Sequence, residues 1–203
     1  MATRGVDHWE WPHAVTLLCG HPCCLKSTVT RKLSFAFEVF ALKSNETGPI
    51  RAQWGQPYLK QRSERYENLF RITEAVLQTK IPLLIDGTFE NRRERTRLAA
   101  LAAKYDYPLL VAYCYASDSD AIASRFAHRF AKGYGPDHRA ASPAIYFDSL
   151  KRFTRVNAAE ESKYDAFVEI DSTSKVITKV ALKHKNWLEV MKRIELAYKG
   201  IDW

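Results

Sequence analysis

The feature that most constrains the fold of this chain is a short run near its beginning, AVTLLCGHPCCLKST. A continuous apolar, β-prone stretch ends at a glycine, and six residues later a lysine is followed by two hydroxyl residues and a helix-like segment. This order is typical of a phosphate-binding loop, strand, G-x-x-x-x-G-K-[ST] and helix. Backbone N–H groups of such a loop and of the helix N-terminus wrap phosphate groups. We therefore expect a nucleotide-binding loop made of Gly20, His21, Pro22, Cys23, Cys24, Leu25, Lys26, Ser27 and Thr28.

Two residues of this loop carry the expected chemistry and one departs from the pattern. Lys26 is placed to neutralise the β- and γ-phosphates of ATP, and Ser27 to hold Mg²⁺. Leu25 stands where the pattern has its second glycine. A side chain at this position is expected to crowd the nucleotide, because glycine normally allows the backbone to approach the phosphates closely.

Apolar patterning along the chain predicts strands alternating with helices. Short apolar runs predict buried strands, and apolar residues at near-helical spacing predict helices between them. This alternation indicates one α/β domain over residues 1–203, with a polar N-terminal tail at 1–12 and a mainly parallel sheet flanked by helices. The predicted strands are 15–19, 81–85, 109–115 and 166–170; the predicted helices are 27–42, 57–78, 91–104, 119–130, 145–156 and 186–199.

Composition narrows the class of protein. Of the 203 residues 46% are hydrophobic, which suffices for a packed core. No apolar run reaches the length of a membrane span and the N-terminus has no apolar signal-peptide core, so a cytoplasmic protein is expected. The four cysteines suit a reducing compartment and are most simply core or loop residues, although a helix N-terminus could make those of the loop reactive. The net charge of +8 favours anionic partners. Alternatively, it only reflects a basic surface that keeps the protein soluble.

Three further residues lie where ligands bind in such sheets, beyond the carboxyl ends of the strands. Asp86 follows the second predicted strand and is a candidate Mg²⁺ ligand and catalytic acid, while its Asp-Gly sequence equally suits an ordinary turn. Arg125 and Arg129 lie four residues apart on one helical face before a loop that contains glycine and proline. Either they stabilise charge on a transferring phosphoryl group, or they form a solvated basic face.

These motifs, in this order, resemble those of the P-loop kinases that include polynucleotide kinases and zeta-toxin kinases. The resemblance covers residues 14 to about 171 and includes Asp86-x-Thr88, the arginine-rich helix from Arg92, and the arginines of the lid. It implies transfer of the γ-phosphoryl group of ATP to a hydroxyl, with Mg²⁺. Asp86 would match the acid that orients or activates the acceptor, and Arg129 the lid arginine.

The chain departs from that group at its general base. Members usually carry an aspartate at the end of a strand after the first helix, and here Glu46 is the nearest acid. A nucleotide-binding module without turnover is therefore an alternative to a kinase. A nucleic-acid 5′-hydroxyl is the expected acceptor, because arginines at 92, 93, 95 and 97 and nearby aromatics suit a polyanion. A nucleoside, sugar or antibiotic hydroxyl suits the fold equally, and the arginines equally suit a solvated helix surface.

Overall fold

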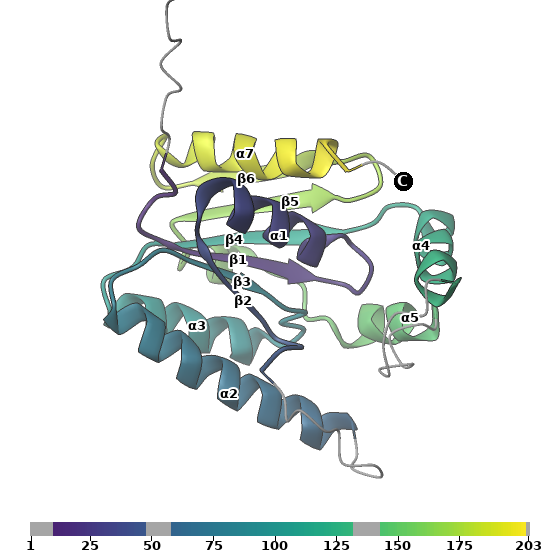
Figure 1. The fold of residues 1–203 in the computed structure, drawn as a ribbon, viewed down its shortest axis with the longest axis horizontal. Helices are drawn as coiled ribbons and strands as arrows, with labels where there is room; N and C mark the ends of the chain where they lie inside the picture. Colours follow the sequence, from purple (N-terminus) through teal and green to yellow (C-terminus); the bar gives the residue numbers. More distant parts are fainter. Residues whose placement is uncertain (1–9, 48–57, 132–142, 202–203) are drawn as a thin grey trace, which may run out of the picture.

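A computed structural model describes residues 10–47, 58–131 and 143–201. Its centre is a six-stranded sheet in the order β2-β3-β1-β4-β5-β6, in which only β6 runs antiparallel to its neighbour (Figure 1). Because the first five strands are parallel, their carboxyl ends meet at one edge of the sheet. The strands are β1 (Val15–Gly20), β2 (Phe40–Lys43), β3 (Leu83–Asp86), β4 (Leu109–Tyr115), β5 (Ala166–Asp171) and β6 (Val176–Leu182).

Helices cover both faces of the sheet and its carboxyl edge. In Figure 1, α1 and α7 lie on one face, α2 and α3 on the other, and α4 and α5 beyond the carboxyl ends of the strands. The helices are α1 (Lys26–Phe37), α2 (Tyr58–Gln78), α3 (Arg92–Lys104), α4 (Ser119–Ala131), α5 (Pro143–Arg152), α6 (Ala158–Glu161) and α7 (Trp187–Lys199). No described helix is both long and apolar enough to cross a membrane.

Alternating side chains of the central strand divide the core into two clusters. Leu18 of β1 packs with Val29 of α1 and Ile194 of α7. Its neighbour Leu17 packs on the opposite face with Leu69 of α2 and Leu98 of α3. Successive residues of a strand point to opposite faces, so a strand covered by helices on both sides is apolar at every position. This explains why β1 reads as one continuous apolar run.

The predicted fold class is confirmed, with one element wrong and two strands unpredicted. The helix expected over 27–42 ends at Phe37, where Glu38 adopts a left-handed conformation with φ 53°, and the chain continues into the edge strand β2. The apolar spacing had run through this break. Strand β6 was also not predicted, because it is an edge strand whose side chains are mostly exposed. The predicted loops at 44–55 and 132–143 lie largely outside the described residues.

Candidate functional site

The loop after β1 begins at a position that only glycine can occupy. Gly20 has φ +127°, and a Cβ built on it would lie 2.0 Å from the backbone oxygen of Cys114 in β4. The Gly20 N–H donates to the carbonyl oxygen of Thr88, 3.1 Å away, beyond the end of β3. The beginning of the loop is therefore held between two neighbouring strands, which gives the following residues a defined path.

Leu25 occupies the second glycine position with its side chain buried in the core. Its backbone is left-handed, with φ 65°, which is the conformation that favours glycine at this position. The side chain is only 4% exposed and packs in the cluster that contains Val29 and Leu33. Burial of the side chain in this cluster argues against the expectation that it crowds the nucleotide. The departure costs backbone strain of about 1–2 kcal/mol.

Lys26, Ser27 and Asp86 come together at the carboxyl edge of the sheet. Lys26 begins α1 and is buried, and its ammonium donates to the carbonyl oxygen of His21 over 2.6 Å, so the side chain spans the loop. Asp86, 4% exposed, ends β3 beside β1. Burial raises the pKa of Asp86, while Lys26 and a hydrogen bond from Ser27 lower it. The parallel sheet thus brings a cation, a hydroxyl and a carboxylate to one place.

Residues 15–155 of the chain match the family described as an AAA domain. The chain belongs to this AAA domain family. No curated protein matches the sequence of this AAA domain chain.

Solved structures share the fold of this AAA domain at low sequence identity. The PezAT toxin–antitoxin system of Streptococcus pneumoniae matches with TM-score 0.60 and 14% identity, over 99% of this chain and 83% of that one. Kti12 of Chaetomium thermophilum, solved with ADP-AlF3, has TM-score 0.60 and 12% identity, over 91% of this chain and 95% of that one. A fungal RNA kinase has TM-score 0.53 and 13% identity, over 89% and 82%. At these identities the likeness shows the fold alone.

Strand β2, which the sequence did not predict, brings two more charges beside Asp86. Lys43 pairs with Asp86 in the register of β2 and β3, and Glu46 follows three residues later. The ammonium of Lys43 lies 2.7 Å from the Glu46 carboxylate, which is more than half exposed. Burial, Lys26 and Ser27 have the largest effects on the pKa of Asp86. Of the two smaller effects, the charge of Lys43 lowers this pKa and the charge of Glu46 raises it. The structure therefore brings Glu46 close to Asp86. Glu46 is the acid that lies nearest in sequence to the position where the general base was expected.

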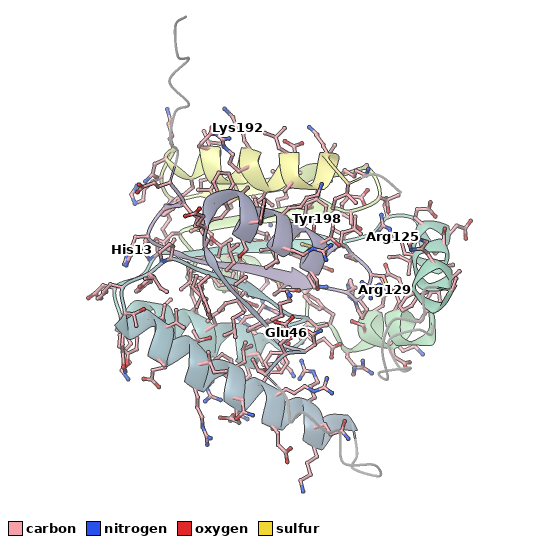
Figure 2. All side chains as sticks on the ribbon, viewed as in Figure 1. His13, Glu46, Arg125, Arg129, Lys192 and Tyr198 are labelled. Atoms are coloured by element: carbon pink, nitrogen blue, oxygen red, sulfur yellow. The ribbon has the colours of Figure 1, made fainter. Side chains whose placement is uncertain are left out.

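The two arginines of α4 differ in their surroundings. Arg125 is buried, and its guanidinium donates to the Cys23 carbonyl over 3.1 Å and to the hydroxyl and carbonyl of Ser172 over 2.9 and 2.7 Å. These hydrogen bonds tie the loop to the turn after β5. Arg129 is half-buried one helical turn further on, and Figure 2 shows both arginines between α4 and the sheet. Burial raises the pKa of the Cys23 thiol, and the guanidinium of Arg129 opposes that shift.

The loop cysteines are buried and are not activated. All four cysteines of the chain are free and buried. Burial raises the pKa of Cys24 to about 11 and also raises that of Cys23, despite the nearby cations. This agrees with the simpler of the two interpretations of the sequence, that the cysteines are core or loop residues, because desolvation of the thiolate outweighs the effect of the helix N-terminus.

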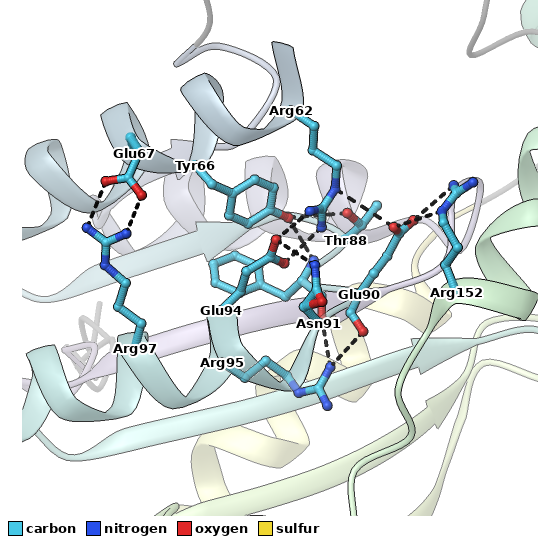
Figure 3. A network of polar contacts seen from close by, with 11 residues as sticks. Arg62, Tyr66, Glu67, Thr88, Glu90, Asn91, Glu94, Arg95, Arg97 and Arg152 are labelled. Atoms are coloured by element: carbon cyan, nitrogen blue, oxygen red, sulfur yellow. Dashed lines mark hydrogen bonds and ion pairs between the residues drawn. The ribbon is translucent and has the colours of Figure 1, made fainter. Parts of the chain in front are cut away.

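The arginines of α3 that were expected to face nucleic acid mostly face carboxylates. Arg95 is completely buried and bonds Glu160, and Arg97 forms a two-fold hydrogen bond with Glu67 of α2, at 2.5 and 2.9 Å. Figure 3 shows the contact between Arg97 and Glu67, and also that of Arg62 of α2 with Glu94. Only Arg92 and Arg93 are exposed without a hydrogen-bonded carboxylate among the described contacts, so α3 offers little free positive charge to a polyanion.

His21 is a buried neutral histidine inside the loop. Its Nε2 and the hydroxyl of Tyr113 form a hydrogen bond of 2.9 Å, and its Nδ1 and the hydroxyl of Ser149 in α5 form one of 3.1 Å. A neutral imidazole offers one donor and one acceptor, and a hydroxyl can take either role. Burial, followed by the charge of Lys26, lowers the pKa of His21 to about 4.

We expect this histidine to make the protein less stable in mild acid. An unfolded chain protonates His21 near its ordinary pKa of 6.5, whereas the folded chain does so only near 4. The unfolded state therefore binds more protons between these values, and the free energy of unfolding falls as the pH drops from 6.5 towards 4. The loss is about 3.5 kcal/mol at most, from about 1.4 kcal/mol for each of the roughly 2.5 pKa units between these values. Urea denaturation of the wild type and His21→Gln should show a shallower pH dependence in the variant; equal slopes would contradict the prediction.

Proposed function

We propose that this AAA domain protein is an ATP-dependent phosphotransferase that moves the γ-phosphoryl group to a hydroxyl acceptor. The observation that supports it best is the convergence of Lys26, Ser27 and Asp86 at the carboxyl edge of the sheet, on a loop that begins at an obligatory glycine. In this arrangement Lys26 would bind the phosphate groups, and the Ser27 hydroxyl and the Asp86 carboxylate beside it would bind a divalent metal ion.

The residues present fit a magnesium ion. Mg²⁺ prefers hard oxygen ligands, and the Ser27 hydroxyl and the Asp86 carboxylate are such ligands within hydrogen-bonding reach of each other. These two side chains would hold the ion, which neutralises phosphate charge when it is bound. Burial disfavours the charged form of Asp86. A bound metal cation would stabilise that charge, so the buried carboxylate favours binding of a cation.

The remaining side chains would position the reacting groups. The Lys26 ammonium, now on the His21 carbonyl, would contact the β- and γ-phosphates, while backbone N–H groups of the loop surround them. Arg129, on the side of α4 that faces the loop, would stabilise charge on the transferring group. Glu46, with its exposed carboxylate beside Asp86, would take the proton from the acceptor hydroxyl.

Two hypotheses for the acceptor and one non-catalytic alternative remain distinct. A polynucleotide 5′-hydroxyl is supported by the net charge of +8, although the paired arginines of α3 weaken this argument. A small hydroxylated molecule, such as a nucleoside, sugar or antibiotic, needs no basic surface. A non-catalytic nucleotide-binding module is supported by the chain having glutamate rather than aspartate near the expected general base.

One screen tests the proposed function. The protein is incubated with γ-labelled ATP, Mg²⁺ and separate pools of 5′-hydroxyl oligonucleotides, nucleosides and sugars, and labelled products are counted. Label on an oligonucleotide, weakened steeply by salt, would support the polynucleotide acceptor, because each phosphate contact with a single strand adds about −0.7 to the salt slope. Label on a nucleoside or sugar would support a small-molecule kinase. Tight ATP binding with no labelled acceptor in any pool would overturn the proposed phosphotransferase.

Asp86→Asn should lower the rate of transfer far more than it lowers stability. The amide keeps the shape of the side chain but removes the charge that would hold the metal. We expect turnover with the active acceptor to fall by about a hundredfold or more, as for other charge-stabilising groups. The matched control is Asp106→Asn, which makes the same change in an exposed turn after α3. Melting temperatures of both variants should stay near that of the wild type, and a fully active Asp86→Asn would leave Asp86 as an ordinary turn residue.

A further inference from the structure

A cavity of about 390 Å³ adjoins the phosphate-binding loop on the face of the sheet that carries α2 and α3. It lies between the carboxyl halves of β4 and β5 on one side and α5 with its following segment on the other. This volume is within the range of small-molecule sites. None of Lys26, Ser27 and Asp86 lines it, so it is separate from the proposed metal and phosphate site.

Aromatic rings form most of its walls, and three of them are nearly parallel. Tyr113 stacks on Phe153 with 4.8 Å between ring centroids and 29° between planes. Tyr115, two residues along β4 on the same face, continues the row at 6.0 Å and 22°. Tyr146 of α5 closes another side, edge-on to His21 at 5.6 Å. Flat rings that already stack on one another offer faces on which a further planar ring can stack.

Two charged groups give the aromatic cavity polarity at one end. Glu169 of β5 lies opposite Tyr113 in the strand register, and its largely buried carboxylate lines the cavity. Arg155 also lines it and is mostly exposed, with its guanidinium 3.9 Å from that carboxylate, which is a long ion pair. A carboxylate accepts hydrogen bonds only, so a ligand at this end should present N–H or O–H donors.

His21 joins the cavity to the phosphate-binding loop. Its ring lines the cavity and bonds Tyr113, while its carbonyl oxygen accepts the ammonium of Lys26 at 2.6 Å. The side chain of His21 thus lines the aromatic cavity, while its backbone carbonyl contacts the lysine of the loop. A molecule in the cavity therefore lies next to the place where phosphates are expected.

We propose that this aromatic cavity binds a nucleobase-type ring, a planar heterocycle with N–H donors. Stacking on Tyr115 and its neighbours would supply affinity, since base stacking on aromatic side chains is favourable for every base. Glu169 would accept from ring N–H groups and favour rings that carry them. The ring could belong to the hydroxyl acceptor or to the donor nucleotide itself. Ring binding requires no phosphoryl transfer, so it can succeed where the proposed function fails.

The test measures binding of guanosine by titration calorimetry in the absence of ATP, with ribose as the matched sugar that lacks the nucleobase. We expect guanosine to bind at least tenfold more tightly than ribose. Tyr115→Leu keeps an apolar side chain but removes the ring, and should weaken guanosine about tenfold. Tyr105→Leu changes another half-buried tyrosine, at the end of α3 outside the cavity, and should leave guanosine binding unchanged. Glu169→Gln should weaken guanosine more than inosine, which lacks the exocyclic amine. Melting temperatures establish that each variant is folded.

A second titration identifies the source of the ring. If guanosine still binds with ATP present, and Tyr115→Leu leaves ATP affinity unchanged, the cavity takes the ring of a second molecule. If ATP displaces guanosine, and Tyr115→Leu weakens ATP but not tripolyphosphate, the cavity takes the base of ATP. Both results support a ring-binding cavity. Equal affinity for guanosine and ribose, or equal losses in Tyr115→Leu and Tyr105→Leu, would overturn it. If guanosine binds but the screen with γ-labelled ATP labels no acceptor in any pool, the kinase is rejected and the cavity proposal stands.

Discussion

Lys26→Ala is expected to weaken ATP binding by about ten- to a hundredfold and to remove phosphoryl transfer almost completely. The ammonium is buried and spans the loop to the His21 carbonyl, so it needs little rearrangement to reach a phosphate. A charge-assisted hydrogen bond contributes about 1.5–3 kcal/mol, which corresponds to the expected change in affinity. Titration calorimetry with ATP and Mg²⁺ measures the affinity, and γ-labelled ATP measures the transfer.

The control for this prediction is another lysine of the same helix. Lys32 lies further along α1, and its ammonium bonds the carbonyl of Gly200. Lys32→Ala removes the same charge from the same helix but away from the loop, and should leave ATP affinity within about twofold, since an exposed charge is largely screened. If Lys26→Ala and Lys32→Ala bind ATP equally well, the loop does not bind phosphate through Lys26.

The juxtaposition at the edge of the sheet could be predicted from sequence because parallel strands allow few arrangements. An acid after one buried strand and a lysine after another must lie at the same edge once the strands are parallel. Ser27 and Asp86 were expected there, and in the structure Lys26 and Ser27 both lie near enough to Asp86 to lower the pKa of its carboxyl group. This argument uses only the order of strands and helices, which continuous apolar runs indicate well.

The parts of the fold that the sequence did not predict are those without a strong apolar signal. Strand β2 has four residues and follows α1 after a two-residue break, so apolar residues at helical spacing run through the boundary. Its absence from the prediction hid the proximity of Lys43 and Glu46 to Asp86. The aromatic cavity was missed for another reason. Tyr113 and Tyr115 lie on the same face of β4, as their spacing of two residues indicates. Phe153 and Glu169 come next to them only through tertiary packing, which the sequence does not show.

Helical spacing held a signal for the role of the α3 arginines that the sequence analysis did not use. Arg95 lies three residues before Leu98 and seven before Ala102, so all three share one face of α3, and all three are buried. Arg92, Arg93 and Arg97 lie outside this face and are exposed. A run of arginines on a helix is therefore not one surface, and the charge count alone overstates what a polyanion could contact.

Arg95→Met is expected to lower the free energy of unfolding by about 3–5 kcal/mol, the largest stability effect that the described contacts predict. The Arg95 guanidinium bonds both carboxylate oxygens of Glu160, at 2.5 and 3.1 Å, and donates to the carbonyls of Phe89 and Thr154, at 2.7 and 2.6 Å. Removing it leaves the buried carboxylate of Glu160 with only the longer ion pair to the partly exposed Arg92, at 3.7 Å, and this costs more than the lost attraction. Urea denaturation measures the change.

Two further variants separate the buried charge from the loss of packing. Arg97→Met removes a similar two-fold contact with Glu67, but both side chains are about half exposed, so we expect a loss below about 1 kcal/mol. Arg95→Met combined with Glu160→Gln removes the stranded charge and keeps an acceptor for the Tyr164 hydroxyl, which donates to Glu160 over 2.6 Å. The double variant should therefore be more stable than Arg95→Met alone. If Arg95→Met cost no more than Arg97→Met, the carboxylate of Glu160 would have to be solvated or protonated in the folded protein, and the buried arginine would be dispensable to the junction of α3 and α6.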